Sequence, residues 1–153
     1  MGFFKFKNRD YDKIVTEAIQ KIDFDPIAEE GEFKFYCGSD ITGGYRFLNC
    51  NIVGPFQVRT KNSCKVCFSD GHEEIEIDSE TVEINTDYSD TLGIGVTAFV
   101  VEIESKLLAW IENSMVKEIR ITFKKESLSF SRIHHLVFKD LLNEENDDSE
   151  EEE

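Results

Sequence analysis

The sequence predicts an α+β fold: a mainly antiparallel sheet of seven to nine strands, curled or doubled into a sandwich or partly closed as a barrel. Helices stand at both ends, and one short helix is inserted. Two observations predict this fold. Between residues 32 and 131 most apolar side chains recur at every second position, and turn-forming residues interrupt them about every ten residues. Before and after this region the apolar spacing is helical.

Composition sets the size of the folded part. The chain has 153 residues, 40% of them hydrophobic and 13 of them phenylalanine, which suits one domain with a substantial core. We place this single globular domain at residues 1–142. Residues 143–153 are nearly all acidic or polar and have no apolar side chains to bury, so we expect a disordered acidic tail there.

Charge restricts the possible partners. The formal net charge is −15, and the tail carries eight acids and no base, so residues 1–142 retain −7. A folded body this acidic opposes nonspecific binding to nucleic acid or to anionic membranes, because both require a basic surface. We therefore expect a basic protein partner, no nucleic acid and no membrane.

The expected location is the cytoplasm. The N-terminus has only a short apolar run without a cleavage site, and no stretch reaches the roughly 20 apolar residues of a spanning helix. We interpret Phe3, Phe4 and Phe6 as packing against the sheet rather than touching a membrane interface. The four cysteines are few for this length, and we expect them to be reduced thiols.

A first helix is predicted at residues 9–21. Asn8 or Asp10 can cap it, and Pro26 lies beyond its end. Its apolar residues share helical spacing and form one stripe that is expected to pack on the sheet. These residues are Tyr11, Ile14, Val15, Ala18, Ile19 and Ile22.

Strands are predicted from the alternating runs that follow. Residues 33–37 and 45–53 are expected to be strands, and residues 38–40 with the glycine pair 43–44 are expected to form a loop between them. Residues 56–60 and 64–69 are expected to pair as a hairpin, and residues 87–95, which contain two glycines, are expected to form a loop. Residues 96–103 form the most apolar strand and carry apolar side chains on both faces, which predicts a central position in the sheet.

The last third of the chain predicts two helices around a hairpin. Ser105 can cap a short helix at residues 106–113, and residues 115–124 then alternate as a strand that turns into a second strand at 127–131. Ser131 can cap a final helix at residues 132–142. Its apolar residues are Ile133, Leu136, Val137, Leu141 and Leu142.

One stretch, residues 66–105, contains eleven acids and no lysine or arginine. Within it the acids of residues 74–78 alternate with isoleucines, as successive side chains of a strand do. This pattern predicts an acidic hairpin with one apolar face, turning at residues 78–81 and returning through residues 82–85. The acids predicted to bind a partner are Glu74, Glu76, Asp78, Glu80, Glu83, Asp87 and Asp90.

Crowded carboxylates have three interpretations. They form a solvated face or an ion network with basic residues of strand 115–124, such as Lys117, Arg120 and Lys124, because like charges need an offset. Alternatively they dock a basic partner, or they serve as general acids or calcium ligands. The spacing matches no EF-hand, and an exposed, flat hairpin gives a carboxyl little desolvation.

No metal and no cofactor are expected. Cys64 and Cys67 are three residues apart on a predicted strand, so they face opposite sides, and a second pair that would complete a zinc site is missing. His134 and His135 are adjacent in the predicted final helix and point about 100° apart. The sequence also lacks a Gly-x-Ser-x-Gly nucleophile elbow.

These observations favour a non-catalytic intracellular protein that binds a basic partner through an acidic sheet face. An inhibitor or immunity-type protein that neutralises a basic toxin or nuclease fits this description, and so does an assembly adaptor, because charge complementarity speeds encounter. One alternative is a curled sheet that encloses a small apolar ligand, lined by Phe35, Phe47, Phe99 and Phe123. A further alternative is a hydrolase that uses clustered carboxylates.

Overall fold

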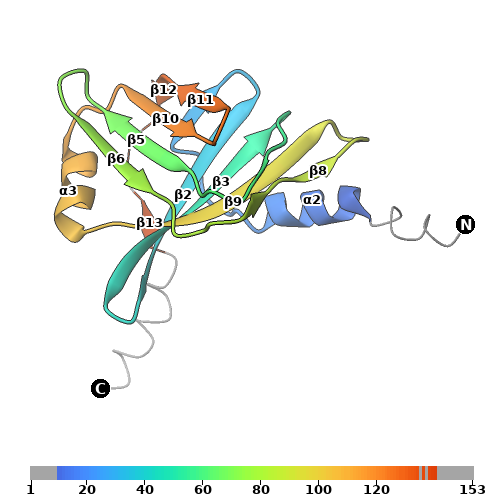
Figure 1. The fold of residues 1–153 in the computed structure, drawn as a ribbon, viewed down its shortest axis with the longest axis horizontal. Helices are drawn as coiled ribbons and strands as arrows, with labels where there is room; N and C mark the ends of the chain where they lie inside the picture. The colour runs from blue at the N-terminus through green and yellow to red at the C-terminus, as the bar shows by residue number, and fades with distance from the viewer. Residues whose placement is uncertain (1–9, 135, 137, 141–153) are drawn as a thin grey trace, which may run out of the picture.

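A computed structural model describes residues 10–134, 136 and 138–140. Two antiparallel sheets lie face to face, with a helix on the outside of the larger sheet and a second helix at one end (Figure 1). The sheets are open, so the predicted α+β sandwich is confirmed and the barrel variant is not formed. Thirteen strands are described, more than the seven to nine expected, because several have only two or three residues.

The larger sheet has seven strands in the order β12-β1-β2-β3-β9-β8, with β13 also paired to β2. Most neighbours are antiparallel, whereas β13 runs parallel to β2. The bounds are β1 (Ala28–Glu30), β2 (Phe33–Thr42), β3 (Tyr45–Gly54), β8 (Asp87–Ser89), β9 (Ile94–Glu102), β12 (Arg132–Ile133) and β13 (Lys139–Asp140).

The smaller sheet has four strands in the order β11-β10-β5-β6, and a separate two-stranded ribbon pairs β4 with β7. The bounds are β5 (Lys65–Ser69), β6 (Glu74–Asp78), β10 (Glu118–Thr122) and β11 (Ser127–Phe130) for the sheet, and β4 (Arg59–Thr60) and β7 (Ile84–Asn85) for the ribbon.

The core lies between the two sheets and follows the period of two in the sequence. Alternate residues of β3 are buried from the larger sheet, as are Ile119 and Ile121 of β10 from the smaller sheet. The inward aromatic rings stack across this space, with the Phe35 and Phe130 centroids 5.8 Å apart. Burying one large apolar side chain stabilises the fold by about 1.5–3 kcal/mol, so this cluster is the main stabilising contact between the sheets.

Helix α2 (Tyr11–Gln20) covers part of the outer face of the larger sheet, as the apolar stripe predicts. The carboxylate of Asp10 accepts a hydrogen bond from the Lys13 amide at 3.1 Å, which confirms Asp10 as the N-cap. Val15 is fully buried against Val53 and Val96. In Figure 1 the helix lies along the end of β9 beside β8.

Helix α3 (Ser105–Asn113) agrees with the predicted short helix, and it buries Leu108 and Ile111. The structure starts the helix at Ser105 itself, so the N-cap is Glu104 and not Ser105. Among the described residues no helix is long and apolar enough to cross a membrane.

The predicted final helix at residues 132–142 is wrong over its described part, where β12 and β13 are strands. Ile133 pairs with Ala28, and the amide of His134 donates to the carbonyl of Ile27 at 2.9 Å. Helical spacing is a weak preference, and the open edges of β1 and β2 offer this segment backbone partners that override it.

The predicted acidic hairpin is also wrong, although its first strand is correct. Strand β6 pairs with β5, and the segment predicted to return beside it forms β7, which pairs with β4. The predicted hairpin of residues 56–60 with 64–69 is wrong too, because β4 pairs with β7 and not with β5. The expectations for Phe3, Phe4, Phe6 and the acidic tail 143–153 lie outside the described residues.

Candidate functional site

The outer face of the four-stranded sheet, which points away from the larger sheet, carries an acidic surface. On β6, Glu74, Glu76 and Asp78 are exposed, while Ile75 and Ile77 point inward and are half-buried. The register places Glu118 of β10 in the same row as Glu74, with Ser69 between them. We call these four carboxylates the acidic face. The period of two in the sequence predicts their common orientation, which is confirmed on β6.

Two basic side chains of the same face partly offset these carboxylates. Lys65 Nζ lies 2.9 Å from Asp78 Oδ1, and Arg120 lies 3.6 Å from Glu74 and 3.4 Å from Glu118. The ion-network interpretation is therefore partly realised, with Arg120 and Lys65 as its cations. Glu76 has no ion pair among the described residues, so the acidic face keeps an excess of negative charge.

The pKa values on this face favour charged groups. A hydrogen bond from the Ser129 hydroxyl, with a smaller contribution from Arg120, lowers the pKa of Glu118 below its ordinary range. The hydrogen bond and charge of Asp78 raise the pKa of Lys65. A general acid requires a carboxyl with a raised pKa, and Glu118 shifts in the opposite direction.

The other predicted acids are spread along the chain that leaves β6. Glu80 and Glu83 are exposed between β6 and β7, whereas Asp87 lies on β8 and Asp90 follows it. Strands β6 and β8 stand toward opposite ends of the molecule (Figure 1). The seven predicted residues therefore do not form one patch, because residues 79–86 cross from the small sheet to the edge of the large one.

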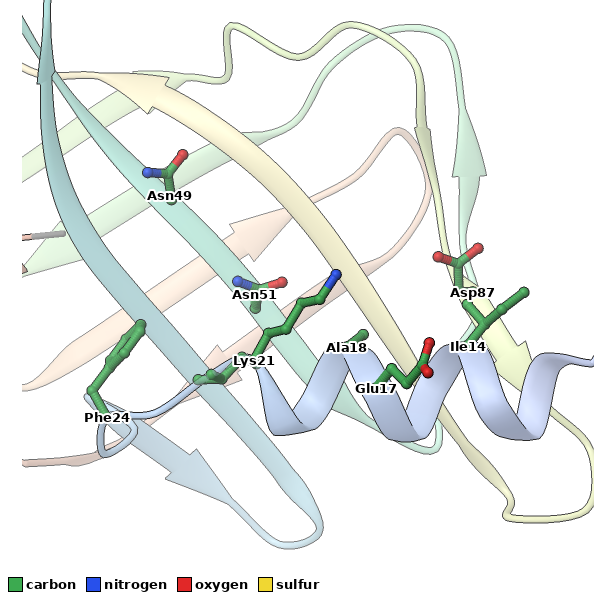
Figure 2. Close-up of a pocket in the computed structure, with 9 residues that line it drawn as sticks. Ile14, Glu17, Ala18, Lys21, Phe24, Asn49, Asn51 and Asp87 are labelled. Carbon is green, nitrogen blue, oxygen red and sulfur yellow. The ribbon is translucent and has the colours of Figure 1, made fainter. Parts of the chain in front are cut away.

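Asp87 instead lines a groove of about 460 Å³ between α2 and the outer face of β3 (Figure 2). Lys21 extends over Asn51 in this groove, and Glu17 points into the same space from α2. The lining residues are Ile14, Glu17, Ala18, Lys21, Ile22, Phe24, Asn49, Asn51 and Asp87. The groove offers hydrogen-bond donors and acceptors beside apolar carbons, but its lining holds neither a serine or cysteine nucleophile nor a histidine base.

Sequence reasoning missed this groove. Asn49 and Asn51 belong to the alternation of β3, where they read as ordinary outward polar residues. The sequence did contain a signal for the groove, namely two amides on the face of β3 that the apolar stripe of α2 must also cover. A helix of ten residues is shorter than a strand of ten residues, so it leaves part of that face uncovered.

The structure brings together three of the four phenylalanines of the predicted ligand cavity and leaves out Phe47. Phe35 lies 6.5 Å from Phe99 and Phe99 lies 6.3 Å from Phe123, measured between ring centroids, and all three are buried in the core. Phe47 is only half-buried and belongs to the opposite set of alternating β3 residues. Three of the rings therefore pack on one another, and the fourth points to the other face of the sheet.

The cysteines are free and buried. Cys37 and Cys50 face each other across β2 and β3 with their sulfurs 3.4 Å apart, and burial raises the pKa of Cys50. Burial also raises the pKa of Cys64 to about 12. Cys67 lies on the outer face beside Glu76, as predicted, yet it is only 4% exposed and its sulfur is 3.7 Å from Glu74.

The described residues contain no group of three histidine, cysteine, aspartate or glutamate side chains that could hold a metal ion. His134 binds Glu29 of β1, with Nε2 2.5 Å from the carboxylate, and this hydrogen bond lowers the pKa of Glu29. His135 lies outside the described residues. The His134–Glu29 pair fastens β12 to β1 and has a structural role.

Comparison of the chain with models of known protein families, with curated proteins and with solved structures gives no match.

Proposed function

We propose that this protein is a non-catalytic binding protein that holds a basic protein partner on its acidic face. The observation that carries the proposal is the row of three exposed carboxylates on β6, which outnumbers the opposing cations and leaves Glu76 without an ion pair within the described part of the chain. A partner with lysine or arginine side chains neutralises this excess. Complementary charge raises the rate of encounter more than it raises affinity.

Binding is favoured over catalysis because of the shape and chemistry of the face. The carboxylates lie on an exposed sheet surface, where water screens them and leaves them little of the desolvation that general acids need. The lowered pKa of Glu118 supports the same conclusion.

A reducing compartment such as the cytoplasm suits this protein, because its four cysteines are buried free thiols and disulfides persist in oxidising environments. In that setting the partner is a basic toxin or nuclease that the protein neutralises, or a basic subunit of an assembly. Both forms use the same face and make the same experimental prediction.

The test is charge reversal at β6. The triple variant Glu74→Lys, Glu76→Lys, Asp78→Lys is compared with a matched control, Glu32→Lys, Glu102→Lys, Glu104→Lys, which changes the net charge equally. Oligolysine is the probe, and association rates are measured at low and high salt. We expect the β6 variant to lose most of the association rate and the control to keep it. Equal losses in both variants, or rates that salt leaves unchanged, contradict the proposal.

A further inference from the structure

Strand β6 ends the four-stranded sheet, and in the described structure its ladder partner is β5 alone. A strand at the edge of a sheet presents unpaired backbone N–H and C=O groups on its free side. In Figure 1 β6 lies at the margin of the small sheet, next to β5. The acidic face therefore ends in a free strand edge.

The register shows which residues of β6 have backbone N–H and C=O groups that do not bond to β5. The amide of Ser79 donates to the carbonyl of Cys64 at 2.8 Å, and the amide of Asp70 donates to the carbonyl of Glu73 at 3.1 Å. In an antiparallel ladder the hydrogen-bonded pairs alternate, so residues 75 and 77 exchange bonds with β5. The N–H and C=O groups of Glu74, Glu76 and Asp78 consequently point to the free edge.

The inner side of this edge is apolar and incompletely covered. Val66 and Phe68 of β5 are at most 1% exposed, whereas their register partners Ile77 and Ile75 on β6 are only half-buried. A strand placed beside β6 covers these isoleucines with its own inward side chains. Its outward side chains then lie beside the three carboxylates.

From this geometry we propose that the partner adds an extended strand to β6, in which lysine or arginine alternates with apolar residues. The inference rests on the proposed function and specifies its binding mode. Backbone hydrogen bonds to Glu74, Glu76 and Asp78 supply the pairing. Basic side chains beside the carboxylates select the partner, and apolar side chains beside Ile75 and Ile77 extend the core.

A second copy of this chain is a poor occupant of the same edge. Pairing β6 with β6 places carboxylates beside carboxylates, and like charges that face each other across a strand pair are destabilising. Charged side chains on an edge strand are a usual guard against such self-pairing. The carboxylates that disfavour a second copy at this edge favour a strand with basic side chains in the same positions.

Two peptides of equal composition separate strand pairing from charge attraction. The first alternates the residues (Lys-Val-Lys-Val-Lys-Val-Lys), and the second groups the lysines and the valines in separate blocks. We expect the alternating peptide to bind full-length protein about tenfold more tightly, a difference of about 1.4 kcal/mol. We also expect it to slow hydrogen exchange at the amides of residues 74, 76 and 78.

Two variants test the role of the edge. Glu76→Pro removes an N–H that points outward and places a ring on the free edge, while the bonds of residues 75 and 77 to β5 remain. Glu76→Gln removes the same charge and keeps the N–H. We expect Glu76→Pro to weaken the alternating peptide about tenfold relative to Glu76→Gln, with thermal unfolding used to verify that both variants fold.

The outcomes distinguish the binding mode from the function. Equal affinities for the two peptides, with no change in exchange at residues 74, 76 and 78, overturn strand addition and leave the charged face as the binding surface. If neither peptide binds, the proposed function fails as well. If sedimentation shows a dimer that Glu76→Pro abolishes, a second copy of the chain pairs with β6 and the inference is overturned. The exchange measurement on the unmodified protein decides the question even if Glu76→Pro does not fold.

Discussion

Replacing Gly95 by alanine is predicted to be one of the most destabilising single-methyl changes in the large sheet. A Cβ at this position would lie 2.5 Å from Thr86 Cγ2, 2.8 Å from the Phe56 carbonyl oxygen and 2.9 Å from Tyr88 Cδ1. Two of these neighbours cannot move freely. The Phe56 oxygen is backbone, and Thr86 is buried with its hydroxyl bonded to the Val58 amide at 2.9 Å.

Overpacking of this kind costs about 1–3 kcal/mol, and we expect Gly95→Ala to lie in the upper half of that range. For a domain of this size the change lowers the melting temperature by about 4–12 °C, measured by calorimetry or circular dichroism.

The matched control is Gly54→Ala, because Gly54 faces Gly95 across β3 and β9. The three atoms nearest to its added methyl all belong to the ring of Phe33, the closest at 2.6 Å, and a half-buried ring can turn aside. The smaller chain entropy of alanine in the unfolded state offsets part of that cost. We expect Gly54→Ala to stay within about 1 kcal/mol of the parent protein. A Gly95→Ala protein that is as stable as Gly54→Ala would refute the reasoning.

Three further predictions concern stability and reactivity. Asp10→Ala removes the side-chain cap of α2 and should cost about 1 kcal/mol in urea unfolding; an unchanged midpoint contradicts the capping role. The pKa values of Glu29, Glu30, Asp70 and Glu118 are all lowered, so these groups stabilise the fold above the unfolded-state values and lose that contribution as pH falls through the folded-state values. The urea concentration at the unfolding midpoint should therefore fall as the pH decreases below about 4.5, and it should fall less steeply in Glu29→Gln. A midpoint that does not change with pH in this range contradicts a stabilising contribution from these carboxylates. Burial raises the pKa of Cys64 to about 12 and also that of Cys50, so both thiols should react with alkylating reagents far more slowly in the folded protein than in urea, and rapid labelling of folded protein argues against their burial.

The sequence predicts which way side chains face better than it predicts which strands are neighbours. Alternation correctly orients Ile119, Arg120 and Ile121 on β10, and helical spacing correctly places α2. Each strand carries this information in its own residues. The partner of β6 is not encoded locally, because any strand with a matching apolar face can lie beside it.

Turn-forming residues led to a wrong prediction in two segments. Gly38, Ser39 and Asp40 indicate a loop, yet β2 continues through them because β3 and β13 pair with it on either side. Ser39 is buried there and accepts a hydrogen bond from Arg46 at 2.5 Å. Residues 87–95 were likewise predicted as a loop, whereas β8 and the start of β9 flank a short turn.

The candidate site divides in the same manner. The common orientation of Glu74, Glu76 and Asp78 follows from the sequence, whereas the free edge of β6 does not, because it depends on which strand is absent from one side. The groove beside α2 brings together Lys21, Asn51 and Asp87 from three elements, and no local pattern connects them.

The pairings of β12 with β1 and of β13 with β2 also determine when the large sheet can be completed during synthesis. Ala28 pairs with Ile133 and Gly38 pairs with Lys139, so about 100 residues are translated between partners, which takes about 5–20 s at 5–20 residues per second. Throughout that interval the nascent chain carries β1 and β2 with an open side. A chaperone that shields residues 28–40 cotranslationally should therefore raise the yield of native protein more than one that acts after release.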